Sequence, residues 1–239
     1  MAIRIEPSQP GARAPLSQDR VLHAAVELAD REGLSALTMR RLAEDLGVEA
    51  MSLYYHVANK EALLDGVVEM IVAEIEGQVG GFDEDLVDED WVATMRRRIL
   101  DARTVMLRHP WAPAVFETRT SIGASVMRYF NSLLGIFRQG GFSYDLAHHG
   151  MHALGSRALG FTQELFNPDP NGEESDSDPD GNEAEMAAMA AQFPYLTEML
   201  GEVAHDDPDS TLGWCDDQTE FEFGLDLILD GLDRLLTDD

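Results

Sequence analysis

Residues 37–60 read LTMRRLAEDLGVEAMSLYYHVANK, and this stretch decides the fold. It predicts two short helices joined by a tight turn. The hydroxyl of Thr38 can cap the first helix, and Gly47 can adopt the positive φ that a sharp turn needs. Ala43 is small enough for the second helix to cross closely, and Leu53 anchors that helix to the same core. The pattern predicts a helix-turn-helix, whose second helix can enter the DNA major groove.

Apolar residues recur at helical spacing on both sides of this motif, so we expect an all-α fold. Ser17 is placed to cap a helix that Gly33 ends, and Asn59 is placed to cap a long connecting helix. Further helices are predicted near residues 91–106, 122–137, 144–165, 183–192, 195–203 and 217–236.

The predicted organisation has three parts. Residues 1–16 form a flexible N-terminal arm, and residues 17–76 form a three-helix helix-turn-helix head, with the motif at about 38–57. A connecting helix joins this head to a helical body, residues 77–239, for ligand binding and dimerisation. Within that body, residues 167–182 are rich in Asp, Glu, Pro, Gly and Ser, and they predict a mobile acidic loop.

The net charge of −28 is unevenly distributed. Residues 1–60 hold seven Arg and Lys against eight Asp and Glu, whereas residues 61–239 hold ten against 37. The acidity therefore belongs to the body, and the head is nearly neutral. Its cations are expected near the groove-facing end of the motif: Arg4, Arg13, Arg20, Arg40, Arg41 and Lys60, the last being the only lysine in the chain. Repulsion from the acidic body should discourage non-specific binding, which depends mostly on phosphate charge.

Composition excludes several classes of protein. The single cysteine, Cys215, excludes an intrachain disulfide and a multi-cysteine metal site. There is no secretion leader and no apolar run near about 18 residues, so we expect a cytoplasmic protein with no membrane partner. Motifs typical of hydrolases, nucleotide-binding enzymes and zinc proteases are absent, so we expect no enzymatic activity, no cofactor and no bound metal.

The last predicted helix carries a second pattern. Its apolar residues are spaced four, three, four and three apart, as in a coiled-coil seam: Phe221, Leu225, Ile228, Leu232 and Leu235. Small or apolar positions beside it, and on the helix from residue 144, would admit a partner backbone: Gly150, Leu154, Ala158, Gly224 and Gly231. Two such helices from each of two subunits would form a four-helix dimer interface. The alternative is that both helices are buried within one subunit.

The motif region resembles the TetR family of bacterial repressors, and its tetracycline-repressor-like members in particular. The resemblance lies in Gly-Val-Glu before the second motif helix, Leu-Tyr-Tyr-His-Val through it and Asn-Lys-x-Ala-Leu-Leu after it. Residues 223–232 also resemble the last helix of these proteins. The resemblance spans about 60 residues of the head. It implies an all-helical homodimer that binds an inverted-repeat operator in double-stranded DNA and is released by a small-molecule effector.

The resemblance also implies the DNA contacts. They fall on Thr38, Met39, Arg40, Ala50, Met51, Ser52, Tyr54, Tyr55, His56 and Lys60. Arg40 can bind guanine through two hydrogen bonds, whereas Tyr54 and Lys60 are suited to phosphates. Ala50 replaces a glutamine that reads adenine in the family pattern, so the operator sequence should differ.

The effector site is expected among the body helices. The resemblance places Thr118 and Glu164 near the ligand of the family, but residues 112–119 contain no histidine, so we expect neither tetracycline nor magnesium. Arg157 suggests an anionic or amphipathic ligand, with a salt bridge to Glu164 as the alternative. The candidate lining is Met106, Phe116, Thr118, Met127, Phe130, His149, His152, Arg157, Phe161 and Glu164.

Two alternatives remain open at this point. His148 and His152 have the four-residue spacing of metal-binding helices, but no nearby cysteine completes a site, so packing in a core or interface is the favoured interpretation. The whole chain could also be a helical scaffold that keeps the head without binding DNA specifically.

Overall fold

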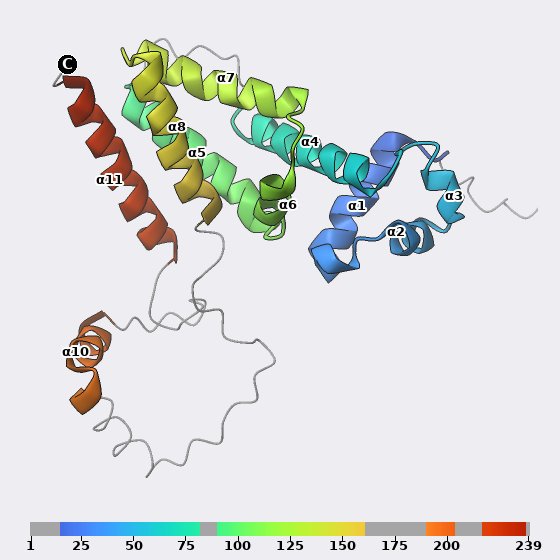
Figure 1. Ribbon diagram of the computed structural model, residues 1–239, viewed down its shortest axis with the longest axis horizontal. Coiled ribbons are helices and arrows are strands. Elements are labelled where there is room, and N and C mark those ends of the chain that lie inside the picture. The colour runs from blue at the N-terminus through green and yellow to red at the C-terminus, as the bar shows by residue number, and fades with distance from the viewer. Residues whose placement is uncertain (1–14, 82–89, 161–189, 204–216, 238–239) are drawn as a thin grey trace, which may run out of the picture. The chain divides into compact units, whose positions relative to one another are not determined.

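The computed structural model describes residues 15–81, 90–160, 190–203 and 217–237. Within these ranges all regular secondary structure is helical, and no strand is present (Figure 1). The predicted N-terminal arm up to residue 14, the loop 167–182 and the candidate residues Phe161 and Glu164 lie outside the described residues. The chain divides into two compact units. The first contains residues 1–82 and 104–130, and the second contains residues 83–103 and 131–239.

The first unit begins with the predicted head helices. They are α1 (Gln18–Glu32), the 3-10 turn η1 (Leu34–Ala36), α2 (Met39–Leu46), α3 (Ala50–Leu53) and α4 (Lys60–Gln78). The caps are as the sequence predicts. Side-chain oxygens of Ser17, Thr38 and Asn59 each accept a hydrogen bond from the backbone N–H three residues later, at 3.2, 3.1 and 2.8 Å. Each cap satisfies one of the N–H groups that a helix start leaves without an internal partner.

The core of the head is built from one apolar face of each helix. Leu28, Leu42, Leu53 and Leu63 come from four different helices, and all have no exposed surface. Along α4 the buried positions recur every three or four residues: Leu63, Leu64, Val67, Val68, Ile71, Val72 and Ile75. Burying such a side chain stabilises the fold by about 1.5–3 kcal/mol. Because this stripe runs the length of α4, the helix is held as a continuous rod.

The remaining helices are α5 (Trp91–Arg108), α6 (Ala112–Thr118), α7 (Ala124–Gln139), α8 (Tyr144–Gly160), α10 (Pro194–Val203) and α11 (Asp217–Thr237). The sequence did not predict α6, because the prolines at 110 and 113 indicate a stop. Pro113 is accommodated in the first turn of α6, where a backbone N–H is not needed. The end of α5, the whole of α6 and the start of α7 belong to the first unit, which therefore extends beyond the predicted head.

In the second unit α5 and α8 pack against α11. The Arg96 guanidinium on α5 bonds to Asp226 and Glu222 on α11, at 2.7 and 2.6 Å. These two bonds raise the pKa of Arg96, Asp226 contributing more than Glu222. An aromatic cluster of Trp91, Phe137 and Phe142 closes the unit beside them, with ring centroids 4.6–5.9 Å apart. None of the described helices is long and apolar enough to cross a membrane.

Candidate DNA-recognition surface

The turn between α2 and α3 has the geometry that its glycine predicts. Gly47 has φ +66° and ψ +40°, a left-handed conformation that is strained for residues with a Cβ. Its N–H donates to the carbonyl of Glu44, and that of Val48 donates to the carbonyl of Ala43 at 3.0 Å. Ala43 is almost completely buried beneath the crossing. The turn therefore fixes the direction in which α3 leaves α2 (Figure 1).

The second helix of the motif is shorter than the sequence indicates. Regular α3 ends at Leu53, and the chain continues through a helical turn in which the N–H groups of His56 and Val57 both donate to the Leu53 carbonyl at 2.9 Å. Leu53 and Val57 are buried, with 0% and 3% exposure. These two anchors hold the whole segment 50–57 on the head core.

The opposite side of this segment faces solvent. Met51, Tyr54 and Tyr55 are 70%, 44% and 88% exposed, although large apolar and aromatic side chains usually bury much of their surface. Ala50, Ser52 and His56 are half-buried between them. An anchored segment that leaves two tyrosines in solvent presents hydroxyl donors and flat rings to a partner.

Two of the predicted cations flank this surface. Arg40 is on the exposed side of α2, and its side chain is 89% exposed while pairing with Glu44 at 3.1 Å. Lys60 is exposed at the first position of α4. A surface pair of this kind contributes little stability, so Arg40 can exchange Glu44 for another acceptor at low cost.

Arg41 was predicted near the groove-facing end of the motif, but its side chain binds carboxylates within the head. Its guanidinium binds Glu32 on α1 at 2.6 Å and lies 3.7 Å from Asp45, while Arg31 binds Asp45 at 2.7 Å. The hydrogen bond from Arg41 lowers the pKa of Glu32 and raises that of Arg41. Arg41 therefore ties α1 to α2 and is not part of the outward surface. Arg4 and Arg13 lie outside the described residues.

A buried histidine joins three elements of the first unit. The ring of His109, between α5 and α6, is 2.7 Å from Asp30 on α1 and 3.1 Å from Glu74 on α4. The indole N–H of Trp111 donates to the same Asp30 oxygen at 2.7 Å, and Arg108 pairs with Glu74 at 2.9 Å. We call Asp30, Glu74, His109 and Trp111 the histidine clamp. It connects the head helix α1 and the end of α4 to the segment before α6.

A second connection lies near the start of α4. The side chain of Arg119, just after α6, is only 10% exposed and bonds to Glu61 at 2.9 Å and Asp65 at 3.2 Å. Beyond it, the backbone N–H of Ser125 donates to Glu69 at 2.9 Å. Gly123 leaves room for Glu69, because a Cβ there would lie 1.9 Å from a Glu69 carboxylate oxygen. α4 is thus connected to the segments on both sides of α6.

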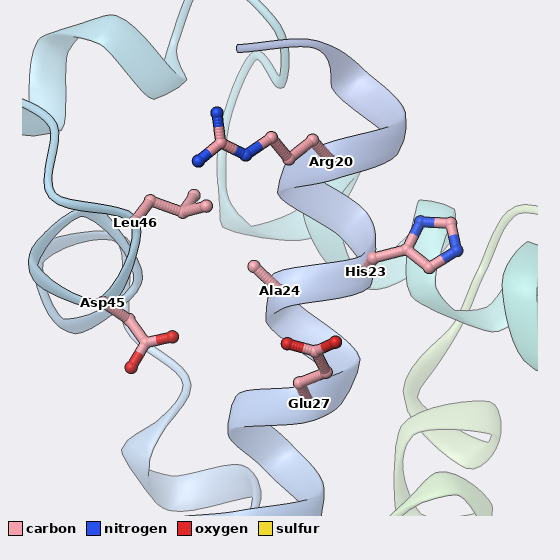
Figure 2. Close-up of a pocket in the computed structure, with 6 residues that line it drawn as sticks. All are labelled: Arg20, His23, Ala24, Glu27, Asp45 and Leu46. Carbon is pink, nitrogen blue, oxygen red and sulfur yellow. The ribbon is translucent and has the colours of Figure 1, made fainter. Parts of the chain in front are cut away.

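Among the surface clefts, two lie in the described part of the first unit, and charged side chains contribute to the lining of both. One, of about 430 Å³, lies between α1 and α2 and is lined by Arg20, His23, Ala24 and Glu27 of α1 and by Asp45 and Leu46 of α2 (Figure 2). The other, of about 300 Å³, lies along α4 beside Arg119 and Ser121. None of the predicted effector residues lines either cleft.

The predicted effector residues that the structure describes are divided between the two units. In the first unit Met106 is buried and Phe116 is half-buried, whereas Met127 and Phe130 are 61% and 40% exposed. The Thr118 hydroxyl donates a hydrogen bond to the carbonyl of Val115 in its own helix. His149 and His152, in the second unit, are exposed.

Arg157 packs on α11. Its guanidinium lies 5.2 Å from the centre of the Phe221 ring and donates to the Glu220 carbonyl, and this burial lowers its pKa. A Cβ on Gly224 would lie 2.6 Å from this guanidinium, so the glycine makes room for Arg157.

The predicted dimer residues separate into two groups. Five of them are buried within their own subunit, which corrects their assignment to an intersubunit seam: Phe221, Leu225, Leu232, Gly150 and Leu154. Leu229 replaces Ile228 in the buried stripe of α11. Ile228, Gly224, Gly231 and Ala158 are half-buried, and Leu235 is exposed. Two further residues of α11, Phe223 and Leu227, are 63% and 58% exposed, and the sequence pattern missed them.

The other missed residues have weak sequence signals. His109 follows a helix and precedes a proline, and only its contacts with residues 79 and 35 positions away reveal its role. Arg119 similarly depends on carboxylates more than 50 positions away. Phe223 and Leu227 could have been found, because with Gly231 and Leu235 they are spaced four residues apart on one helix face.

This arrangement, a helix-turn-helix with an exposed tyrosine-bearing segment joined by a long helix to a helical body, defines a class of DNA-binding regulator. Sequence comparison specifies the class. Residues 21–67 match the family described as bacterial regulatory proteins, tetR family, and residues 85–236 match the tetracyclin repressor-like C-terminal domain. The chain belongs to the TetR family of transcriptional regulators.

Individual proteins agree with this assignment. The transcriptional repressor DrrR1 of Streptomyces coeruleorubidus is 31% identical over 95% of this chain and 80% of its own length. A possible TetR family regulator from Streptomyces coelicolor A3(2) superposes with a TM-score of 0.72 at 28% identity, covering 92% of this chain and all of that one. ActR from Streptomyces coelicolor, in complex with actinorhodin, superposes with a TM-score of 0.69 at 27% identity, covering 92% of this chain and 97% of that one.

Proposed function

We propose that this protein is a homodimeric transcriptional repressor that binds an inverted-repeat operator and releases it when a small molecule binds the body. The observation that carries the proposal is the outward surface of residues 50–57, where Tyr54 and Tyr55 face solvent while Leu53 and Val57 hold the segment on the head core. This surface has the composition and support that reading a major groove requires.

The proposed contacts follow from position and chemistry. Arg40 binds a base edge, preferentially guanine, and Ala50 and Met51 make apolar contacts with thymine methyl groups. Tyr54, Tyr55 and Lys60 bind phosphates and set the register, with His56 and Ser52 as further donors. Thr38 and Met39 lie at the edge of the surface, since the Thr38 hydroxyl already caps α2.

The dimer is proposed to form through the exposed side of α11. Phe223, Leu227 and Leu235 form an apolar surface there, and a Cβ on Gly231 would meet no atom within 4 Å. A second copy of the chain can therefore approach this side closely. The pairing places two recognition segments on one molecule, as an operator with two half-sites about 34 Å apart requires.

Release of the operator is proposed to depend on the connections of α4. The histidine clamp holds one end of α4, and Arg119 holds the other, so a ligand that shifts α6 shifts α4 with it. Because α4 shares its core with α1 and α3, the recognition segments then lose their half-site spacing. The ActR complex with actinorhodin supports small-molecule binding in proteins of this fold. We propose that the effector of this chain is not tetracycline with magnesium, since residues 112–119 lack a histidine.

The test is a gel-shift titration of the full chain on the DNA upstream of its own gene, repeated at increasing salt. We expect a discrete complex that resists competitor DNA and persists at salt concentrations where non-specific binding is lost. Weak retention that disappears equally for every DNA fragment would instead support a scaffold without specific DNA binding.

A further inference from the structure

The histidines of α8 face away from the core of their unit. Gly150 and Leu154 are buried, whereas His148 and His152 are exposed, as expected for positions on opposite sides of a helix. The sequence favours packing in a core or an interface, and this exposure excludes the core of their own subunit.

His148 and His152 lie against each other. Their ring centroids are 4.6 Å apart with the planes at 83°, one helical turn apart on α8. Neither ring makes a hydrogen bond or ion pair with any described residue. The His149 ring is farther from His148, with ring centroids 5.9 Å apart, and its Nε2 lies 3.9 Å from Asp145, one turn earlier. The ring nitrogens of His148 and His152 are thus both close together and available.

We propose that His148 and His152 form a two-histidine site that chelates a borderline divalent transition-metal ion such as Zn²⁺, Ni²⁺ or Cu²⁺. Metal–nitrogen bonds of about 2.0–2.1 Å require two ring nitrogens about 3.3 Å apart, a separation that rings with centroids 4.6 Å apart reach by small side-chain rotations. Two histidines four residues apart on one helix face meet this requirement, as in zinc-binding helices.

The donor set determines which ion binds. Imidazole favours zinc, copper and nickel, whereas magnesium and calcium favour oxygen ligands. No cluster of three or more metal-binding side chains occurs among the described residues, so water completes the coordination. The bound ion would connect successive turns of α8 and stabilise the folded chain by linkage.

The acidic surface requires a control, because a net charge of −28 attracts any divalent cation. Excess Mg²⁺ occupies carboxylate sites without competing for imidazole. The experiment is therefore a calorimetric titration of the full chain, freed of metal with a chelator, with Zn²⁺ in excess Mg²⁺. We expect saturable binding of one zinc ion per chain.

Matched variants locate the site. H148Q and H152Q should each weaken zinc binding by at least about tenfold, because the second ligand no longer benefits from the high effective concentration of the first. H149Q and H23Q remove exposed histidines outside the pair and should leave the affinity unchanged. The electron paramagnetic resonance spectrum of bound Cu²⁺ should show two nitrogen ligands in the wild type and one in H152Q.

Several results would overturn the proposal. These are no zinc binding in excess Mg²⁺, equal binding in H148Q, H152Q and wild type, and an equal loss in H149Q. A Cu²⁺ spectrum without two nitrogen ligands in the wild type would also overturn it. The glutamine variants change only exposed positions, and an unchanged far-UV circular dichroism spectrum verifies that they fold.

Discussion

In the head, α2 and α3 approach each other closely, and in the second unit α8 and α11 do the same. The two pairs differ in the chemistry of the side chains that they expose to solvent. In both pairs a small residue lies at the close approach: Ala43 in the head, and Gly150 and Gly224 in the second unit. The outward segment of residues 50–57 carries two tyrosines and lies near cations, whereas the outer side of α11 carries Phe223, Leu227 and Leu235.

This difference indicates what each surface binds. A DNA backbone is charged and hydrated, so a partner surface of hydroxyls, rings and cations fits it. An apolar helix face is suited to another protein surface from which water is excluded. We therefore propose that the head and α11 have separate partners, DNA and a second copy of the chain, and that each can be removed without the other.

The largest loss of operator affinity is expected from a substitution that prevents dimerisation. L227D places a charge in the centre of the α11 surface and should convert the dimer to a monomer. Operator affinity should then fall by a factor of about 10²–10⁴, since two linked half-site contacts become one. Sedimentation and gel-shift titration measure the two effects. L107D, which makes the same change at an exposed leucine of α5, should leave both properties intact.

Removing an aromatic donor from the head should weaken DNA binding while preserving the dimer. Y54A loses a hydrogen bond to a charged phosphate, worth about 1.5 kcal/mol, in each of two half-sites, so affinity should fall by on the order of a hundredfold. Y195A removes a tyrosine on α10 that is 86% exposed, against 44% for Tyr54, and serves as the control. Unchanged operator affinity in Y54A would show that the outward segment does not bind DNA.

Arg40 should affect base preference more than affinity for DNA in general. R40A removes a bidentate contact that provides about 1–3 kcal/mol of discrimination. Selection of binding sites from a random DNA pool should show relaxed preference at one position in each half-site. A uniform loss across all sequences would instead identify Arg40 as a phosphate contact.

The histidine clamp should contribute more stability than the more exposed contacts of Arg96 in the second unit. H109Q leaves the Asp30 and Glu74 carboxylates incompletely bonded in a partly buried position and should lower the free energy of unfolding by about 1–3 kcal/mol. R96A breaks more exposed contacts and should cost about 0–1 kcal/mol. Chemical denaturation of both variants measures this difference, and an equal loss would contradict the distinction.

The smallest effect is expected on the pH dependence of unfolding, through the carboxylate of Glu32. The pKa of Glu32 in the folded head is below its ordinary value of 4.5, chiefly because Arg41 donates a hydrogen bond to it. This stabilisation is therefore complete above that ordinary value and is lost as the pH falls through the lower folded value. E32Q should reduce the acid dependence of unfolding in this window, whereas E220Q should not. Equal acid dependence in E32Q and wild type would contradict the assignment.

Local signals in the sequence were sufficient to predict the helix caps and the turn of the head. The caps at Ser17, Thr38 and Asn59 and the turn at Gly47 were all predicted, because each depends on the chemistry of one residue and its immediate neighbours. The end of α3 at Leu53 was not predicted, because a turn whose N–H groups bond to the Leu53 carbonyl differs only slightly from a continuing helix.

The interior of the second unit could not be predicted as well. α11 is apolar on more than one side, so its spacing fits both a seam through Ile228 and the observed buried stripe through Leu229. Arg157 and Gly224 lie 67 positions apart in the sequence, and no local pattern indicates that the glycine makes room for the arginine. Contacts of this range depend on how whole helices pack, which a single sequence does not specify.

The central claim is that two outward segments of residues 50–57 read one operator together. Hydroxyl-radical footprinting of the full chain on its upstream DNA tests this claim most directly. The account predicts two protected patches of equal strength, related by two-fold symmetry and about one helical turn apart. A single patch, or protection without symmetry, would contradict it.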